Sequence, residues 1–353
     1  MRQGVLRIAL LIATSCWASV GWPAPARAAE EKPNGVTMLH TLLDAVWEKD
    51  LEDDPRAATQ LGDSRFNALW ADHSASAWAQ RNRLYATMLD AASRIDAQQL
   101  PPAEQLNREL FIRLLRNRLD QYRFNAQLRA LDQLNYSNGI LTASETAEVI
   151  NFATTRDYED WIARLAGMGR YVDQTIALLR EGIKQKNTQP RVIVDRVAKQ
   201  LQAQLVGDPT RSPFYAPFNR FADAVAAEDR QRLAGAAQEA IRTTVVPAFE
   251  RLQTFVNKEY LSASRATVGI WDTPNGADFY RNRVEWFTTT HLSPQEIHAI
   301  GLKEVDRIHA QMLKIIAQVG FNGSFAEFLT QLRTDPKFRY SSSDELLRLA
   351  VGG

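Results

Sequence analysis

The feature that most constrains the fold is the spacing of the apolar residues, which recur every three or four positions along much of the chain. The clearest stripe comprises Tyr158, Trp161, Ile162, Leu165, Met168, Val172, Ile176, Leu179 and Ile183. Steps of this size place the side chains on one face of a helix. Similar stripes cover 36–50, 76–98, 102–125 and 228–260, and no run of alternating strands is found. We therefore predict an all-α protein, built as an extended multi-helix bundle.

Helix start and stop signals support this prediction in the last quarter of the chain. Residues 293–296, Ser-Pro-Gln-Glu, form a capping box with proline at the first helical position, where its missing N–H costs nothing. Gly320 is a typical residue for ending that helix. Ser324 and Ser342, each followed three residues later by glutamate, predict the starts of two further helices.

The N-terminal segment has the composition of an export signal. Arg2 and Arg7 precede an apolar stretch at 8–20, and Ala26-Arg27-Ala28 is a small-x-small cleavage site. We predict a signal peptide at 1–28, a helical domain at 29–353, and a periplasmic or secreted location. The apolar stretch is short for a membrane span, so no stable span is expected after cleavage. Lipid attachment at Cys16 is the alternative, but the preceding residues match the usual motif poorly, and simple secretion is favoured.

Charge and cysteine content exclude some classes of function. The formal net charge of the 353-residue chain is +1, which gives no support to nucleic-acid binding. Cys16 is the only cysteine, so removal of the signal peptide would leave neither a disulfide nor thiol chemistry. An oxidising compartment would therefore pose no folding problem.

A serine-esterase site is a weak alternative. Gly62-Asp63-Ser64 and the Asp306–His309 pair resemble the nucleophile and base blocks of Gly-Asp-Ser lipases. In those enzymes the serine follows a buried strand, whereas 55–61 here is helical or irregular in pattern. Asp306 and His309 fall within a predicted helix, where such neighbours normally form a solvated pair. We therefore expect no esterase site at Ser64.

The remaining polar residues do not form a recognisable metal or catalytic motif. His298 and His309 lie roughly 16 Å apart along one helix at 1.5 Å per residue, which is too far to share a metal ion. We expect the histidines to be at the surface or half-buried. The acidic run at 48–54, which includes Asp50 and Asp53, is interpreted as a solvated helix end.

Aromatic residues gather just before the capped helix. We expect Trp286 and Phe287 to pack in the core. Tyr280 follows the turn Pro274-Asn275-Gly276 and is expected to line a cleft with its hydroxyl group free.

The pattern of residues 276–338 resembles the bacterial domain of unknown function 885 (DUF885) family. The likeness rests on Gly276 and Tyr280, on Leu292-Ser293-Pro294 with Glu296-Ile297-His298, and on Asp335-Pro336-Lys337-Phe338. Near the start, Pro55, Ala58-Thr59 and Gly62 resemble the family's opening Pro-x-x-Ala-Thr-x-x-Gly. The likeness spans about residues 36–348 and is most specific in the last quarter.

The resemblance implies a mostly helical, often exported protein that is similar to gluzincin-type zinc metallopeptidases. Zinc is expected for the full-length family, but its motif, His-Glu-x-x-Pro-Gly-His, does not occur in this chain. No residue here therefore inherits a catalytic or metal-binding role. Gly276 and Tyr280 are the substrate-binding candidates, with a peptide as the implied substrate.

The leading hypothesis is the exported N-terminal helical portion of a zinc-metallopeptidase-like protein, truncated at its C-terminus, without the metal-binding half, and inactive as given. Leu346, Leu347 and Leu349 would then offer an apolar face through which the chain self-associates. One alternative is a non-catalytic helical envelope protein that binds peptides or a protein partner. The other is the esterase with Ser64, Asp306 and His309.

We predict that signal peptidase cleaves after Ala28, because a positive start, an apolar middle and a small-x-small site occur together. N-terminal sequencing of the product exported by a bacterial host checks this. A periplasmic product that still begins at Met1 would contradict it.

Overall fold

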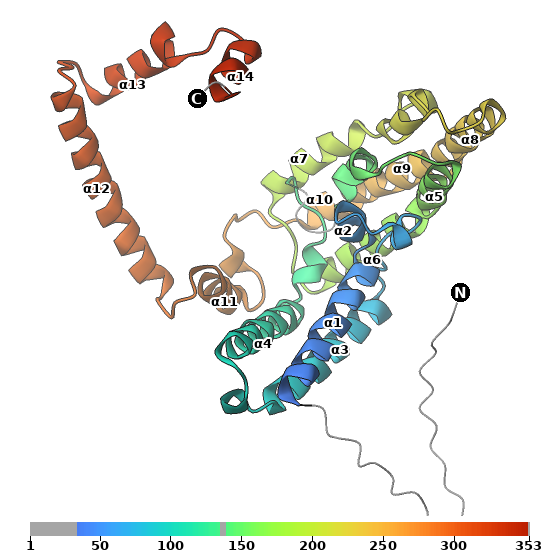
Figure 1. The fold of residues 1–353 in the computed structure, drawn as a ribbon, viewed down its shortest axis with the longest axis horizontal. Coiled ribbons are helices and arrows are strands. Elements are labelled where there is room, and N and C mark those ends of the chain that lie inside the picture. The colour runs from blue at the N-terminus through green and yellow to red at the C-terminus, as the bar shows by residue number, and fades with distance from the viewer. Residues whose placement is uncertain (1–33, 135–138, 352–353) are drawn as a thin grey trace, which may run out of the picture.

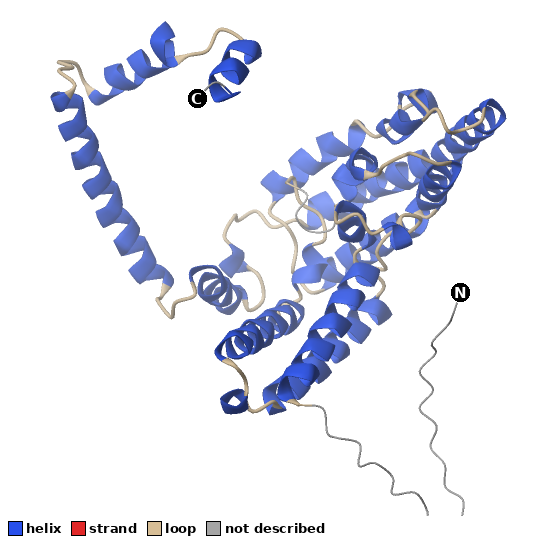
Figure 2. Cartoon of the chain, in the orientation of Figure 1, coloured by secondary structure: helices blue, strands red, loops and turns tan. Residues whose placement is uncertain are grey.

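The computed structural model describes residues 34–134 and 139–351, and these residues are arranged as helices and connecting loops (Figure 2). The α-helices are α1 (Gly35–Asp53), α2 (Pro55–Gln60), α3 (Ala75–Arg94), α4 (Pro102–Arg123), α5 (Thr155–Ala166), α6 (Met168–Lys184), α7 (Arg191–Gln202), α8 (Ala227–Ala240), α9 (Val246–Phe255), α10 (Leu261–Ala263), α11 (Gly276–Thr288), α12 (Pro294–Gln318), α13 (Phe325–Thr334) and α14 (Ser343–Val351). The 3-10 segments are η1 (Ser64–Phe66), η2 (Ala97–Gln99), η3 (Ala126–Arg129), η4 (Ile140–Val149), η5 (Pro209–Arg211), η6 (Pro213–Asn219), η9 (Ile270–Asp272) and η10 (Pro336–Phe338).

The all-α prediction is confirmed. Within the described residues there is no β-strand, only an isolated bridge between Pro190 and Arg265. The predicted signal peptide and Cys16 lie outside the described residues.

The predicted capping signals are present as hydrogen bonds. The Ser293 hydroxyl accepts from the backbone N–H of Glu296 at 3.2 Å, and the Glu296 carboxylate accepts from the backbone N–H of Ser293 at 2.7 Å. Gly320, just beyond α12, has a φ of +75°, which glycine adopts without steric cost. Local sequence therefore determines the ends of α12.

The apolar stripe at 158–183 belongs to two helices rather than one. α5 ends at Ala166 and α6 begins at Met168, with Gly167 between them. A β-carbon at Gly167 would lie 3.3 Å from the Trp70 ring, so the glycine lets the indole approach the helix junction.

A long helical segment runs from α8 to α10 and contains two π-helical turns, η7 (Ile241–Val245) and η8 (Val256–Tyr260). Pro247, at the start of α9, lacks an N–H, and its ring would clash with the carbonyl four residues earlier in a regular α-helix. The wider turn at η7 provides room for that ring, which explains why the helix continues past a proline.

The buried apolar residues form two cores. The smaller core lies among α1, α3 and α4 and includes Leu39, Val46, Phe111 and Leu115. The larger core is built mainly from α5 to α9, with η4 and η6. Figure 1 shows α1, α3 and α4 as one group and α5 to α10 as a second group, with α2 at the junction.

Helices α12 to α14 extend away from both groups (Figure 1). α11 docks on α4, where Arg113 donates to the Trp286 carbonyl at 2.7 Å and the Phe124 and Phe279 rings lie 5.5 Å apart. The prediction that Phe287 packs in the core is wrong, because its side chain is 78% exposed on the outer face of α11. Trp286 is half-buried beneath the Arg113 guanidinium.

The apolar positions of α12 and α14 are largely solvent-exposed. Val305 is 64% exposed and Leu347 is 60% exposed, whereas Ile316 is buried. Phe321 and Phe328 pack against each other where α12 meets α13, with ring centroids 5.2 Å apart.

None of the helices in the described ranges combines the length and the apolar character needed to cross a bilayer.

We predict that Leu165→Ala lowers the free energy of unfolding by about 2–5 kcal/mol, because Leu165 is fully buried in the larger core. Val305→Ala should change it by less than about 0.5 kcal/mol, because that side chain is mostly exposed. Chemical denaturation of both variants checks this. A large loss from Val305→Ala would show that α12 packs against other groups in solution.

Candidate functional site

The two residues singled out from the sequence, Gly276 and Tyr280, lie on α11. Gly276 is packed against the loop before the helix, and a β-carbon there would overlap the Ile270 carbonyl. Tyr280 is 40% exposed, and its ring meets that of Trp271 edge-on at 6.3 Å. Neither residue lines the main cavity. Their role in substrate binding stays a prediction.

The esterase residues are not brought together. Ser64 begins η1, where the Asp63 carboxylate accepts from the Arg65 backbone N–H at 3.0 Å, so this segment is a capped turn. η1 contacts α2, whereas Asp306 and His309 are exposed on α12, which Figure 1 shows well separated from α2.

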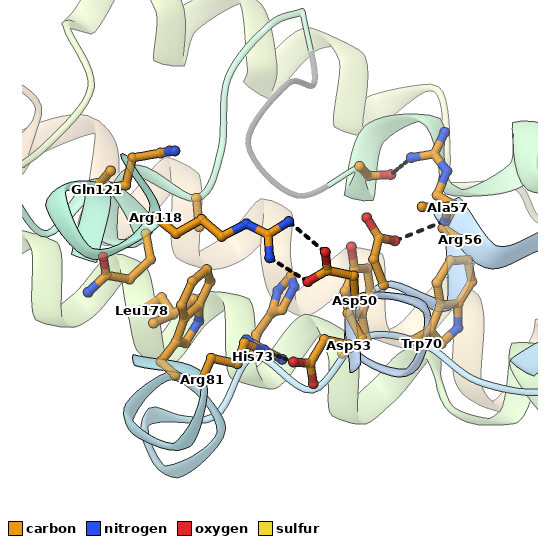
Figure 3. A pocket seen from close by; sticks show the side chains of 18 of the residues that line it. Asp50, Asp53, Arg56, Ala57, Trp70, His73, Arg81, Arg118, Gln121 and Leu178 are labelled. Carbon is orange, nitrogen blue, oxygen red and sulfur yellow. Dashed lines mark hydrogen bonds and ion pairs between the residues drawn. The ribbon is translucent and has the colours of Figure 1, made fainter. Parts of the chain in front are cut away.

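A cavity of about 1000 Å³, here called the junction cavity, lies at the junction of the two cores. Its walls come from α1, α2, α3, α4, α6, η3, η4 and the loop before α3. The lining combines aromatic rings with paired charges, contributed mainly by Trp47, Asp50, Asp53, Arg56, Trp70, His73, Trp78, Arg81, Tyr85, Arg118, Arg129 and Tyr171. Figure 3 shows Arg56 and Trp70 at one end, Arg118 and Gln121 at the other, and His73 and Asp53 between them.

Asp50, on α1, is held by α3 and α4. Its carboxylate pairs with both terminal nitrogens of Arg118, at 2.7 and 2.5 Å, and accepts from the Tyr85 hydroxyl at 3.1 Å. The Arg118 guanidinium lies 4.8 Å from the centre of the Tyr85 ring. Burial, together with the negative charge of Asp50, raises the pKa of Tyr85 to about 12. Tyr85 therefore remains a neutral hydrogen-bond donor to the Asp50 carboxylate.

Asp53, one helical turn further along α1, forms a second unit of the same kind. Its carboxylate lies 3.2 Å from Arg81 Nε and 3.0 Å from Lys49 Nζ. The Arg81 guanidinium stacks over the Trp78 ring at 4.9 Å and donates to the Asp72 carbonyl. Because Asp50 and Asp53 are three residues apart, they share the helix face that lines the cavity.

The interpretation of the acidic run as a solvated helix end is therefore wrong for Asp50 and Asp53. Both line the cavity, and each has an arginine partner from another helix. The signal available in the sequence was their spacing on the helix. It could not identify Arg81 and Arg118, which lie far away along the chain.

His73 is buried rather than half-buried, with 8% of its surface exposed. Its ring lies 5.1 Å from that of Tyr171, and its backbone N–H donates to the Gln174 side chain at 2.9 Å. Burial, reinforced by the positive charge of Arg81, lowers the pKa of His73 to about 4. The imidazole is therefore neutral at pH 7.

Two arginines that line the cavity have no carboxylate partner among the described residues. Arg56 donates to the Gly139 carbonyl at 3.0 Å and to the Thr142 hydroxyl at 2.8 Å. Arg129 donates to the Asn187 side chain at 2.6 Å. Burial lowers the pKa of Arg129 to about 10, but the group remains charged at neutral pH. Neither guanidinium is therefore balanced by an ion pair with a described carboxylate.

The described residues do not fit a zinc site. No three His, Cys, Asp or Glu side chains gather in a metal-holding group within the described ranges. His40 pairs with Glu104 at 3.0 Å and His291 pairs with Glu285 at 3.3 Å. No chemical step of this chain is therefore assigned to zinc.

We predict that His73 makes the protein less stable in acid. Since the pKa of His73 is lowered in the folded state, the unfolded chain binds its proton first as the pH falls from about 6.5 to about 4. Between pH 7 and pH 4 this linkage lowers the free energy of unfolding by about 3 kcal/mol. The His73→Gln variant should not show this loss of unfolding free energy between pH 7 and pH 4. Chemical denaturation of both proteins at the two pH values measures the difference. The same pH dependence in both proteins would contradict it.

Comparison with known proteins identifies a family and a similar solved structure. The sequence profile of the bacterial proteins of unknown function DUF885 matches residues 55–350. The structure is similar to the crystal structure of a candidate lipoprotein from Colwellia psychrerythraea, with a TM-score of 0.80 and 20% sequence identity. The similarity covers 90% of this chain and 57% of the other chain. No curated protein matches.

The two findings carry different weight. At 20% identity the solved structure supports the fold alone, and the chain spans 57% of that protein's length. The family profile covers most of the sequence. It includes the cavity-lining residues from Arg56 onward, helices α12 and α13, and all but the last residue of α14, whereas the α1 wall of the cavity precedes it. The chain therefore belongs to the bacterial DUF885 family.

Proposed function

We propose that this chain is the exported, peptide-binding helical portion of a peptidase-like DUF885 protein, and that it does not hydrolyse peptides itself. The observation that carries the proposal is the junction cavity between two helical cores, with its aromatic rings and fixed Asp–Arg pairs. Cavities with a mostly apolar lining and a few oriented polar groups are the usual form of small-ligand sites.

The lining suits a peptide in both size and chemistry. A volume of about 1000 Å³ is at the upper end of typical ligand pockets and has room for a few residues of extended peptide. Trp47, which is exposed, and Trp78, which is half-buried, provide flat surfaces for side chains, and the polar groups between them can pair with peptide N–H and C=O groups. Gly276 and Tyr280, outside the cavity, remain proposed contacts for a longer peptide.

Export is supported by the positive start, apolar middle and cleavage site in residues 1–28. The candidate-lipoprotein description of the structural neighbour points in the same direction. Peptidase-like character follows only from the family resemblance. Hydrolysis by such an enzyme needs a metal-activated water and a general base, and the family's motif for that chemistry does not occur in this sequence.

The second candidate function is a non-catalytic envelope protein that docks a partner through α12 to α14. The exposed apolar residues of these helices favour it, among them Val305 at 64% and Leu349 at 59%. The same face is the proposed surface for self-association.

We predict that the purified chain binds short peptides with micromolar to millimolar Kd but does not cleave them, with or without added zinc. Calorimetry on a set of unstructured peptides measures binding, and mass spectrometry of the same mixtures detects cleavage. Hydrolysis that zinc restores and a chelator removes would contradict the non-catalytic part. Failure of every peptide to bind, with capture of a protein by α12 to α14, would favour the second candidate.

A further inference from the structure

Six of the ten buried side-chain polar atoms without a hydrogen-bond partner in the described structure belong to residues that line the junction cavity, and the others belong to Thr146, Arg164 and Gln204. Among the described residues, the cavity-lining side chains with such an atom are Asp53, Arg56, His73, Trp78, Arg81 and Gln127. The Asp53 and Arg81 atoms belong to an ion pair at 3.2 Å, so their charges are compensated. The other four atoms have no partner. Each such atom costs about 1–3 kcal/mol of desolvation free energy, so their gathering at one cavity indicates groups that a ligand completes.

The unpaired atoms favour a ligand that supplies hydrogen-bond acceptors. Arg56 Nε and Trp78 Nε1 both carry N–H donors and have no acceptor. His73 Nδ1 can donate or accept according to its tautomer, and the Gln127 amide can turn to present either group. Arg56 Nε and Trp78 Nε1, the two groups that can only donate, therefore both require an acceptor.

The lining contains four arginines and four acidic residues, and two of the arginines offer a local contact for an anionic acceptor. Asp50 and Asp53 are each neutralised by an arginine, whereas Arg56 and Arg129 have no carboxylate partner in the described structure. The other acidic residues of the lining are Asp54, which caps α2 by accepting from the Ala57 N–H, and Glu145, which is exposed. A carboxylate that reaches Arg56 would form a charge-assisted hydrogen bond inside a partly desolvated wall.

We propose that the junction cavity binds a small organic carboxylate with an apolar or aromatic body, with the carboxylate on Arg56. Trp78 Nε1 donates to a further carbonyl oxygen of the ligand, and the body packs against the ring of Trp47, which is 52% exposed in the lining. A free C-terminal residue of a peptide and a free N-acylated amino acid share this chemistry. The assignment of the ligand to a peptide C-terminus rests on the proposed function, whereas binding of a free carboxylate does not.

Calorimetric titration with N-acetyl-phenylalanine and N-acetyl-phenylalaninamide tests the proposal, since the two probes differ only in the charged end. We expect the acid to bind at least about tenfold more tightly than the amide, as the loss of a charge-assisted hydrogen bond implies. An alanyl-phenylalanine extension with a free C-terminus forms the peptide arm. Tighter binding of the extended probe than of the single residue assigns the site to peptide ends.

The Arg56→Gln substitution should weaken binding of the acid probe by roughly tenfold or more and leave the affinity for the amide probe unchanged. The Trp78→Phe substitution keeps an aromatic ring and removes the Nε1–H donor, so the affinity for both probes should fall by a few-fold. Arg251→Gln is the matched control, because Arg251 pairs with Asp173 outside this cavity. Circular dichroism establishes that each variant is folded.

Equal affinity for the acid and the amide, or no loss of acid binding in folded Arg56→Gln and Trp78→Phe proteins, would overturn the proposal. So would failure of both probes to bind at millimolar concentration. Peptides that bind equally well with a free or an amidated C-terminus would overturn the carboxylate assignment while leaving peptide binding intact. Binding of the single-residue acid without any peptide binding would refute the proposed function and support the carboxylate site.

Discussion

The fully buried guanidinium of Arg164 is the interaction on which the relative position of the two cores depends. Its Nη2 donates to the Pro55 carbonyl at 3.2 Å, to the Thr59 hydroxyl at 3.0 Å and to the Phe66 carbonyl at 2.9 Å. In the other direction, the Trp70 indole donates to the Arg164 carbonyl at 2.6 Å. Arg164 on α5 therefore fixes α2 and η1, and through them the end of α1, to the larger core.

This attachment explains why the junction cavity keeps its shape. Burial lowers the pKa of Arg164 to about 10, so the group is still charged at neutral pH. Its three acceptors all contact Nη2, whereas Nε and Nη1 are buried without a hydrogen-bond partner, so these three contacts are the ones that stabilise the charge. Removing one acceptor of a buried charge lowers the free energy of unfolding by far more than the hydrogen bond itself contributes, because the charge then remains buried without a partner. α2 is held in place by this requirement, and Arg56, which follows Pro55, faces the cavity from a fixed backbone.

The sequence was sufficient for the local structure and the family, because both depend on residues close together in the chain. Apolar spacing and capping boxes predict α12 from Ser293 to Gly320, and the structure confirms those ends. DUF885 membership is likewise confirmed. The cavity could not be predicted in this way. Asp50 needs Arg118, which lies 68 positions away, and no local pattern records that pairing. The same limit explains the wrong expectation for Phe287, since an apolar residue on a helix does not reveal whether another helix covers it.

The two Asp–Arg units give the cavity a further property that follows from their place on α1. Asp50 and Asp53 line the cavity, while Leu39 and Val46 of the same helix belong to the smaller core. α1 therefore belongs to both the ligand-facing wall and the packing of α3 and α4. Any ligand that binds only when these pairs are formed stabilises the smaller core by RT ln(1 + [L]/Kd), although it touches none of that core's apolar side chains. For such a ligand, the stability of the α1–α3–α4 group rises with the occupancy of the cavity, because α1 contributes residues to both.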